Sequence, residues 1–371
     1  LNNVFSQSSA KKNTRALGSV KSMIGHTKAA AGAAGMIKTI LSLYNKVLLP
    51  TLKADNPDPN LKTDASPFYL NPETRPWFSK NKHPRRSGVS AFGFGGSNFH
   101  VVLEEYQKKK EITSWDCSVD IVALSAPTPH DLAKSINNFK RDVEKESSNE
   151  QFSISAAISR HNFSIKDQYR LLLTIDRETK KSTLFSDALK IVESGQTKDK
   201  SNNPNICYSD NQFPGKIGFL FPGQGSQYIG MGRDLVCTFA DAFAVLEDVN
   251  KRFHQSSLLS DLIYPRPART KDQLKDQALE LQRTDIAQPA IGAISLSMLK
   301  ILQGFGVKPE ATGGHSYGEL TALHAAEWID YDTFFHLSIL RGQHMAHVCE
   351  KNGHSAGGML ALFAPLDRLT Q

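Results

Sequence analysis

The chain has 371 residues, of which 40% are hydrophobic and 22% are charged, and it carries a formal net charge of +7 at pH 7. This length allows two or three domains with a substantial core, and the composition is that of an ordinary globular protein. No run of about 18 apolar residues occurs, so a membrane-spanning protein is not predicted. The basic runs lack the interleaved aromatic residues of a nucleic-acid-binding surface, so a nucleic-acid-binding protein is not predicted either.

The cysteines and the first residues indicate the compartment. Cys117, Cys207, Cys237 and Cys349 form no Cys-x-x-Cys pair, so neither a zinc site nor a disulfide framework is predicted. A reduced, cytoplasmic compartment fits this pattern, because the start Leu1–Val4 is no signal peptide. The chain also begins without Met, so we expect it to be part of something longer.

Residues 1–108 form the first predicted block. Its first segment, Gly18–His26, leads into Thr27–Leu41, which is helical in rhythm and lined with Ala and Gly. Such a helix can approach other backbone closely, so we expect a buried central helix. His26 lies at its start, where it either caps a packed helix or, as a neutral ring, donates a hydrogen bond to a ligand.

A glycine-rich loop follows later in this block. Three glycines between aromatic residues in Phe92–Asn98 predict a mobile loop that can swing Phe94 and bring its backbone N–H near a substrate oxygen. Taken alone, the loop could cradle a phosphate. It leads into the predicted strand Val101–Glu104 rather than into a helix, so a dinucleotide fingerprint is not expected.

Residues 109–213 predict a separate small α/β unit without a catalytic motif. The segment Asp120–Ser125 reads as a strand. Thr128 then opens a helix, because a capping hydroxyl, a proline at the first helical position and an acid at the third follow one another.

The rest of this unit again predicts a strand followed by a helix. Tyr169–Ile175 predicts a second strand, and the helix Leu184–Val192 ends near Gly195. The polar tract Gln196–Asn203 is a predicted flexible boundary.

A further domain is predicted from Gly215 onward. Lys216–Phe221 reads as a buried strand that ends in the turn Pro222–Gln227. This order places Gln224 at the carboxyl end of the strand, where α/β sheets bind ligands. Its amide either donates to a substrate oxygen or satisfies the local turn.

The segment Gly314-His315-Ser316-Tyr317-Gly318 has the Gly-x-Ser-x-Gly pattern of a nucleophile on a tight strand-to-helix turn. Val307–Thr312 before it predicts a strand, and Leu320–Trp328 after it predicts a helix. A β-carbon at either glycine would collide with the neighbouring strand or helix. Ser316 is therefore expected at a helix N-terminus, where backbone N–H groups such as that of Tyr317 can hold an oxyanion.

Two further features accompany this motif. Gly353–Gly357 repeats the pattern around Ser355, but an apolar strand follows rather than precedes it, so a loop is predicted. Arg341 lies in the helical run Phe334–Met345. An arginine on such an apolar face is either a surface charge or a clamp for a carboxylate.

The first block resembles the C-terminal part of a β-ketoacyl synthase of polyketide synthase type, on the residues Val20-Lys21-Ser22…Gly25-His26 and the loop Phe92–Asn98. The family usually has Thr where this chain has Ser97. The resemblance implies that His26 is the second active-site histidine, Lys21 a buried lysine that supports it, and Phe94 the gate of the acyl pocket. It also implies that the nucleophilic Cys and the first histidine lie before residue 1.

The last block resembles malonyl-type acyltransferases, on Phe221–Gln227, Gly314–Glu319 and Arg341. The resemblance implies Ser316 as the nucleophile, Gln224 and the Tyr317 N–H as oxyanion donors, and Arg341 as partner of the malonyl carboxylate. It implies a catalytic histidine roughly a hundred residues beyond the serine, past the end of the chain.

These resemblances imply an α/β fold in three parts. Residues 1–108 would be the end of a thiolase-like ketosynthase domain, and 109–213 resemble the linker domain that joins ketosynthase to acyltransferase. Residues 214–371 would form the α/β-hydrolase-like core of an acyltransferase, cut off at Met359–Phe363, which resembles the first strand of its ferredoxin-like subdomain. This order is that of a polyketide or fatty-acid megasynthase. The segments Tyr69–Trp77 and Thr284–Pro289 look most similar to polyunsaturated fatty acid synthases.

The expected chemistry is ping-pong transfer, in which Ser316 takes malonyl from malonyl-CoA and passes it to a carrier-protein phosphopantetheine thiol. The adjoining ketosynthase would use that malonyl in decarboxylative condensation, with His26 stabilising the enolate. The resemblance implies thioester substrates, no metal and no tightly bound cofactor. The implied partners are an acyl carrier protein domain, the remaining synthase domains and a second copy through the complete ketosynthase, with no nucleic acid or membrane.

Two alternatives stay open. The chain could be an inactive truncated fragment with a docking or scaffold role. It could also be a serine esterase-type hydrolase, in which Arg341 and Gln224 have no role.

Overall fold

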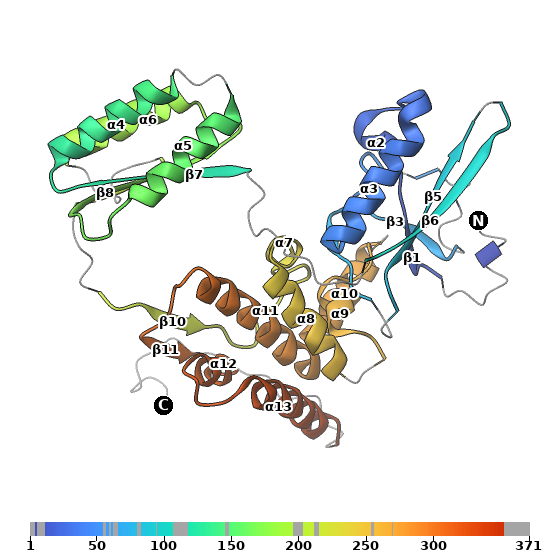
Figure 1. Ribbon diagram of the computed structural model, residues 1–371. Coiled ribbons are helices and arrows are strands. Elements are labelled where there is room, and N and C mark those ends of the chain that lie inside the picture. The colour runs from blue at the N-terminus through green and yellow to red at the C-terminus, as the bar shows by residue number, and fades with distance from the viewer. Residues whose placement is uncertain are drawn as a thin grey trace. The chain divides into compact units, whose positions relative to one another are not determined.

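The structure is a computed structural model that describes residues 4–5, 12–54, 57–58, 61, 66–79, 83–93, 95–106, 118–144, 148–195, 203–210, 215–253, 256–268 and 270–351. Its contacts divide the chain into two compact units, residues 112–215 and residues 1–111 together with 216–371. Both units combine helices and strands, which confirms the predicted α/β class (Figure 1).

The unit of residues 112–215 is a three-stranded antiparallel sheet packed against helices. The strands, in the order β7-β8-β9, are β7 (Val119–Ala126), β8 (Tyr169–Asp176) and β9 (Ile206–Ser209). The helices are α4 (Pro129–Val143), α5 (Asn149–Asn162) and α6 (Lys181–Ser194). Inward-facing residues such as Leu171 and Leu173 alternate along β8 and meet Ile136, Phe152 and Phe185 from the helices in one core.

The predicted helix start at Thr128 and the predicted helix end near Gly195 are confirmed, whereas α6 begins at Lys181 and not at the predicted Leu184. Thr128 caps α4, because its Oγ1 accepts from the Asp131 N–H at 3.1 Å and donates to the Asp131 carboxylate at 2.6 Å. Gly195 ends α6 in the left-handed conformation, at φ +65°. The predicted boundary Gln196–Asn203 falls outside the described residues except for Asn203.

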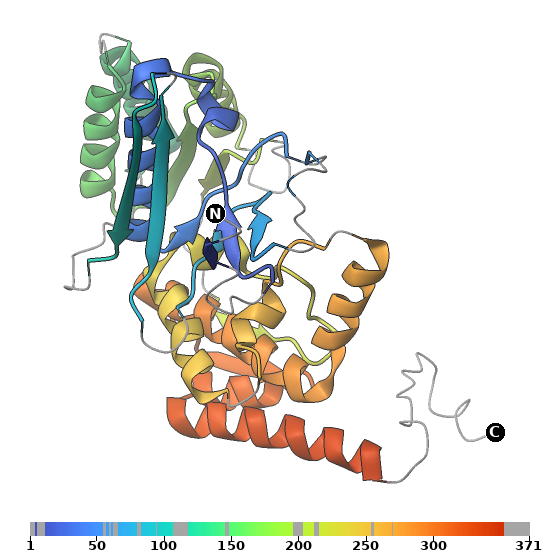
Figure 2. The ribbon, with the colours of Figure 1, turned by 90° about the vertical axis from the view of Figure 1, so that its right-hand side faces the viewer.

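Residues 12–106 contribute short strands, two short helical turns and one long helix to the other unit. These elements are β1 (Arg15–Leu17), α2 (Lys21–Ile24), the 3-10 turn η1 (Lys28–Ala30), α3 (Ala31–Asn45), β2 (Val47–Leu48), β3 (Phe68–Leu70), β4 (Arg75–Pro76), β5 (Arg86–Phe92) and β6 (Asn98–Glu104). Strands β5 and β6 form an antiparallel hairpin that lies beside α3, as Figure 2 shows.

The prediction of a buried central helix was wrong in its extent. The helix α3 begins at Ala31, and only Ser42 and Leu43 in it are buried. The small residues do allow close approach on one side, because a β-carbon on Gly32 would lie 3.1 Å from Ala91 of β5. The opposite side carries apolar side chains such as Ile37, which is exposed because no described residue packs over it.

The segment that contains β4 joins this region to the last part of the chain. Arg75, buried, donates a hydrogen bond to the Tyr264 carbonyl oxygen. Phe78 stacks on Phe243, with 4.5 Å between the ring centroids. Buried arginine and stacked aromatic contacts of this kind hold the segment against the core rather than on its surface.

Arg85 is a second anchor at the same junction. It is 5% exposed and bridges Glu105 at 2.6 Å and Glu247 at 3.1 Å. A buried guanidinium needs such partners, because an unpaired charge in the interior is costly.

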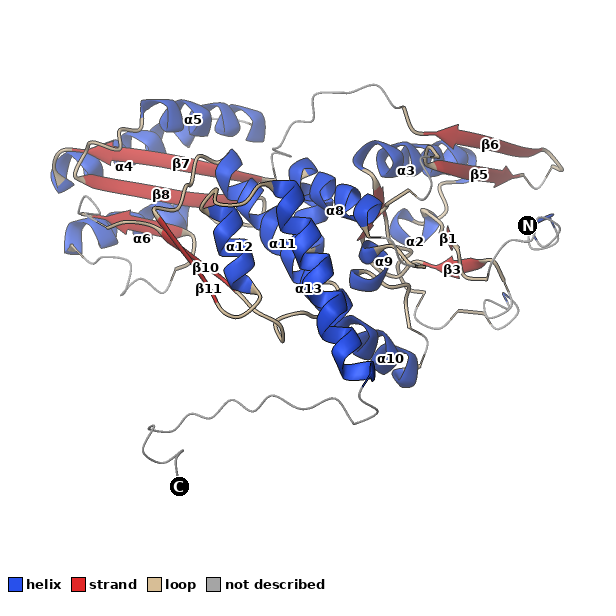
Figure 3. Ribbon diagram, turned by 90° about the horizontal axis from the view of Figure 1, so that it is seen from below, coloured by secondary structure: helices blue, strands red, loops and turns tan. Residues whose placement is uncertain are grey.

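Residues 215–351 combine a helical core with a pair of parallel strands. The strands are β10 (Gly218–Phe221) and β11 (Ala311–Gly314), and the helices are α7 (Arg233–Thr238), α8 (Ala240–Arg252), α9 (Leu259–Ile263), α10 (Lys271–Gln282), α11 (Thr284–Gly304), α12 (Gly318–Ala325) and α13 (Tyr331–Lys351). Figure 3 shows α11 and α13 side by side, and the contacts between them agree.

Helix α11 is the central element of this core. It alone among the described helices is long and apolar enough to cross a membrane, but 78% of its apolar window is buried inside the protein. Its residues from Asp285 to Ser297 are all buried. Such burial is typical of a core helix that is apolar on every side.

The strand before the serine motif begins later than the sequence predicts. The described β11 starts at Ala311 and not at Val307. Pro309 has no N–H to give to a ladder, and pairing starts only where the Glu310 N–H donates to the Ile217 carbonyl at 2.8 Å. The helix after the motif begins at Gly318, two residues earlier than predicted.

Candidate active site

The Gly-x-Ser-x-Gly segment is a sharp turn between β11 and α12. Phe221 pairs with Gly314 at the end of the parallel ladder, and the His315 N–H donates to the Phe221 carbonyl at 3.1 Å. Ser316 follows at φ +54°, a left-handed conformation that costs a non-glycine residue about 1–3 kcal/mol. The turn thereby presents Ser316 exposed at the carboxyl end of the strands.

Both glycines of the motif are required by contact distances. A β-carbon on Gly314 would lie 2.0 Å from the Gly318 carbonyl carbon, and one on Gly318 would lie 2.1 Å from the Phe221 carbonyl oxygen. These contacts are with backbone, which cannot swing aside. The sequence-based reason for the two glycines is therefore confirmed.

A third glycine fixes the neighbouring loop against the serine. A β-carbon on Gly223 would lie 2.4 Å from the His315 carbonyl oxygen and 3.2 Å from the Ser316 Cβ. The loop after β10 thus lies directly beside the serine. The backbone N–H groups of Gln224 and Tyr317 have no acceptor among the described residues, so both are free to bind an oxygen at this point.

The side chain of Tyr317 anchors the turn from below. It is completely buried, and its hydroxyl lies 2.7 Å from the Ser338 Oγ on α13. Gly292 of α11 makes room for it, because a β-carbon there would lie 2.1 Å from the hydroxyl. Burial raises the pKa of Tyr317 far above its ordinary value, against the opposing effects of Ser338 and the nearby Arg341 charge, so the hydroxyl stays neutral.

Arg341 belongs to the same group of side chains. Its Nη1 donates to the Gln288 Oε1 at 2.7 Å, and the Gln288 Nε2 lies 3.4 Å from the Gln224 Oε1. The Gln224 amide nitrogen in turn donates to the Thr284 Oγ1 at 3.0 Å. The guanidinium is half-buried and connected to the loop beside the serine, which is not the setting of a free surface charge.

Close helix packing sets the position of this arginine. A β-carbon on Gly342 would lie 2.9 Å from the Thr284 carbonyl oxygen, so α13 meets the start of α11 immediately next to Arg341. Neither Gly342 nor Gln288 was predicted as a site residue from the sequence. A glycine inside a long helix was the available signal, since such a glycine often marks a close approach.

The structure thus brings Ser316, Tyr317, Gln224 and Arg341 together, but not in every detail as expected. The Gln224 side-chain nitrogen is engaged by Thr284, so its amide does not point freely at a substrate. The backbone N–H of Gln224 is the donor that remains available.

The residues assigned to the ketosynthase part are either exposed or outside the described residues. The expectation of a buried lysine was wrong for the described residues, because Lys21 is exposed and no residue of α2 is buried. His26 is also exposed, and its Nδ1 accepts the Lys28 N–H at 3.0 Å, which caps the η1 turn and leaves Nε2 as a donor. Phe94, Ser355 and the strand expected at Met359–Phe363 lie outside the described residues.

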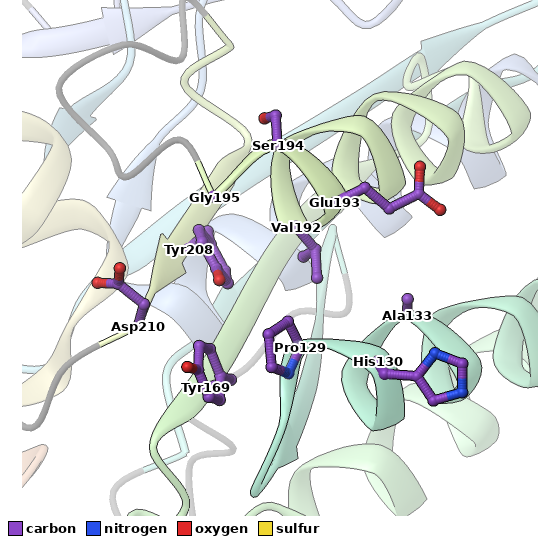
Figure 4. A pocket seen from close by; sticks show the side chains of 10 residues that line it. All are labelled: Pro129, His130, Ala133, Tyr169, Val192, Glu193, Ser194, Gly195, Tyr208 and Asp210. Atoms are coloured by element: carbon purple, nitrogen blue, oxygen red, sulfur yellow. The ribbon is translucent and has the colours of Figure 1, made fainter.

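Two hollows lie elsewhere. One, of about 510 Å³, is in the unit of residues 112–215 and is drawn in Figure 4, where Pro129, Tyr169, Val192 and Tyr208 come from four different elements. The other, of about 540 Å³, is lined by residues that include Ala311 and Ala325, so it lies at the start of β11, the opposite end of the strand from the serine. In the described part of the chain no group of three or more His, Cys, Asp or Glu residues could hold a metal ion.

Three family models match the chain in succession. Residues 1–55 match the β-ketoacyl synthase C-terminal domain, residues 57–170 the ketoacyl-synthetase C-terminal extension, and residues 218–365 the acyl transferase domain. The chain therefore carries the C-terminal part of a ketosynthase, its C-terminal extension and part of an acyltransferase in one polypeptide, the order that the sequence predicts.

Known relatives agree with this assignment. The chain is 29% identical over 382 residues to a polyunsaturated fatty acid synthase polypeptide of Thraustochytrium sp., in an alignment that covers 93% of this chain and 13% of that protein. It is 31% identical over 364 residues to a phenolphthiocerol/phthiocerol polyketide synthase polypeptide of Mycobacterium tuberculosis, covering 96% and 23%. The chain thus spans less than a quarter of the length of these two relatives.

A solved structure supports the fold. The acyl transferase domain of ZmaA matches with a TM-score of 0.50 and 22% identity, over 63% of this chain and 50% of that one. At this identity the likeness concerns the fold alone.

Proposed function

We propose that the acyltransferase part loads malonyl from malonyl-CoA onto Ser316 and passes it to the phosphopantetheine thiol of an acyl carrier protein. In the first half, the Ser316 oxygen attacks the thioester carbonyl carbon, the C–S bond breaks, and the serine proton goes by way of a general base to the departing CoA thiolate. In the second half, the carrier thiol attacks the Ser316 ester, and the serine oxygen recovers a proton. By the family resemblance, the base is a histidine.

The geometry of the turn supports Ser316 as the nucleophile. The left-handed backbone of Ser316 exposes its hydroxyl at a helix start. Tyr317 follows Ser316 and Gln224 follows Gly223, whose backbone lies directly against Ser316, and the N–H groups of both residues have no acceptor among the described residues. Such preorganised donors stabilise the negative oxygen of a tetrahedral intermediate, typically by several kcal/mol.

The single observation that carries the choice of malonyl is the half-buried Arg341. Its contact with Gln288 uses one N–H and leaves further guanidinium donors for a ligand. A carboxylate on the incoming acyl group would pair with this charge, whereas an uncharged acyl group would leave it unpaired. An esterase for uncharged esters has no use for that cation.

The test is the mass of the Ser316 peptide after the full synthase that contains this chain is incubated with malonyl-CoA. We expect a malonyl adduct on Ser316 that Ser316→Ala removes. Ser355→Ala is the matched control, because it changes the serine of the other Gly-x-Ser-x-Gly sequence and should leave the adduct in place. A wild-type synthase without adduct would refute the proposal and favour a scaffold role.

We further propose the division into a ketosynthase part (1–108), a linker domain (109–213) and an acyltransferase part (214–371). In this proposal Lys21, His26 and Phe94 serve decarboxylative condensation in a complete ketosynthase, which forms a homodimer in the cytoplasm. Support for the order of the parts comes from the succession of matched family models, and support for the bounds of the middle part comes from the compact unit of residues 112–215. His26 presents its Nε2 as a donor.

A further inference from the structure

Gln288 is a buried polar residue in the core of the acyltransferase part, and none of the roles described above explains it. It lies on α11 and has no solvent-exposed surface. A buried amide is costly unless its donors and acceptor are satisfied, and here they reach three other side chains. The Oε1 accepts from Arg341, and the Nε2 lies near the Gln224 Oε1 and 3.3 Å from the Met345 Sδ.

The orientation of this amide follows from the arginine. A guanidinium carries only donors, so the Gln288 oxygen must face it and the nitrogen must face away. The reversed amide would place two donors against each other at 2.7 Å. The same rule then turns the Gln224 oxygen towards Gln288 and the Gln224 nitrogen towards Thr284.

The chain of donors and acceptors therefore has one direction, from Arg341 through Gln288 and Gln224 to Thr284. It holds the guanidinium from the side of the core. Without Gln288, Arg341 would lose its described side-chain acceptor and could swing into solvent on a long flexible stem.

We propose that Gln288 is a positioning residue that fixes Arg341 in the cleft and thereby sets the preference for acyl groups that carry a free carboxylate. This inference rests on the proposed malonyl transfer. Gln288 acts through Arg341, so it affects the binding of a carboxylated acyl group and not the chemistry at Ser316. Gln224 keeps its bond to Thr284 when Gln288 is replaced, so the loop beside the serine retains an anchor.

The test is the concentration dependence of Ser316 acylation in the full synthase, measured with malonyl-CoA and with acetyl-CoA. In Gln288→Leu we expect the half-saturating malonyl-CoA concentration to rise about tenfold while the maximal rate stays the same, since a contact made equally before and during the reaction affects KM. Acylation by acetyl-CoA should not change. In Gln288→Glu a carboxylate would hold Arg341 but compete with the substrate, so malonyl-CoA binding should weaken at least as much.

Ser297→Ala is the matched control, because it removes a buried hydrogen bond, from Ser297 Oγ to the Ala293 carbonyl at 2.8 Å, on the same helix. We expect Ser297→Ala to leave the acylation of Ser316 by malonyl-CoA and by acetyl-CoA unchanged. Gln288→Leu should also add no loss for malonyl-CoA to an Arg341→Ala protein, because the two residues act as a unit.

Three results would overturn the role of Gln288 and leave the proposed function untouched. Gln288→Leu could weaken acylation by both thioesters equally, weaken neither, or further weaken acylation by malonyl-CoA in the Arg341→Ala protein. An Arg341→Ala protein that loads malonyl as well as wild type would overturn both this inference and the proposed function.

Discussion

The sharp turn at Ser316 predicts a large effect for Gly314→Ala. The new β-carbon would lie 2.0 Å from the Gly318 carbonyl carbon, so the turn must open by about 1.4 Å to reach an ordinary 3.4 Å contact. Overpacking against backbone costs about 3 kcal/mol or more. A displacement of about 1 Å at a nucleophile slows its reaction by roughly a hundredfold.

The matched control is Gly304→Ala at the end of α11, where an added β-carbon would meet nothing within 4 Å. There the loss of chain freedom in the unfolded state should stabilise the protein by about 0.4–1 kcal/mol. The assays are thermal unfolding and the rate of Ser316 acylation. A Gly314→Ala protein as stable and as fast as Gly304→Ala would refute the contact geometry of the turn.

Three smaller predictions concern other parts of the chain. Thr128→Ala should destabilise the unit of residues 112–215 by about 1 kcal/mol in urea unfolding through loss of the cap, and Thr128→Ser should not. Arg85→Leu removes the charge partner of the poorly exposed Glu105 carboxylate and should lower the stability measured by thermal unfolding by about 3 kcal/mol. Adding Glu105→Gln should restore most of this loss, and a double variant no more stable than Arg85→Leu alone would contradict the prediction. Burial raises the pKa of the Cys237 thiol to about 11, so alkylation at pH 8 should be at least about tenfold slower than at the exposed Cys207 and should speed up as the pH rises towards 11. Peptide mapping that finds both thiols equally reactive at pH 8 would contradict the buried setting.

Local patterns in the sequence predict local structure well in this chain. The cap at Thr128 and the glycine end at Gly195 are properties of adjacent residues, so they are readable without a fold. The same holds for the glycines around Ser316, whose requirement follows from the turn itself.

What the sequence does not reveal depends on contacts between distant segments. Gln288 and Arg341 lie 53 positions apart, and the sequence around neither residue predicts that Arg341 donates a hydrogen bond to Gln288. The burial of α3 was overestimated for the same reason, since an Ala- and Gly-rich pattern indicates that a helix can be packed but not that something covers it. The burial of Lys21 was implied by the family resemblance and not by the residues around it. The start of β11 was placed too early because Pro309 cannot donate to a ladder, so pairing with β10 begins only after it.

The proposed malonyl transfer requires the guanidinium of Arg341 and the hydroxyl of Ser316 to act on one substrate. The most direct measurement is a competition, in which the full synthase meets equal concentrations of malonyl-CoA and acetyl-CoA and the two Ser316 adducts are quantified by mass. We expect wild type to carry mostly malonyl, and Arg341→Ala to lose that preference by about a hundredfold or more, the factor that corresponds to an unpaired charge of about 3 kcal/mol. A malonyl-to-acetyl ratio that is the same in both proteins would contradict the account.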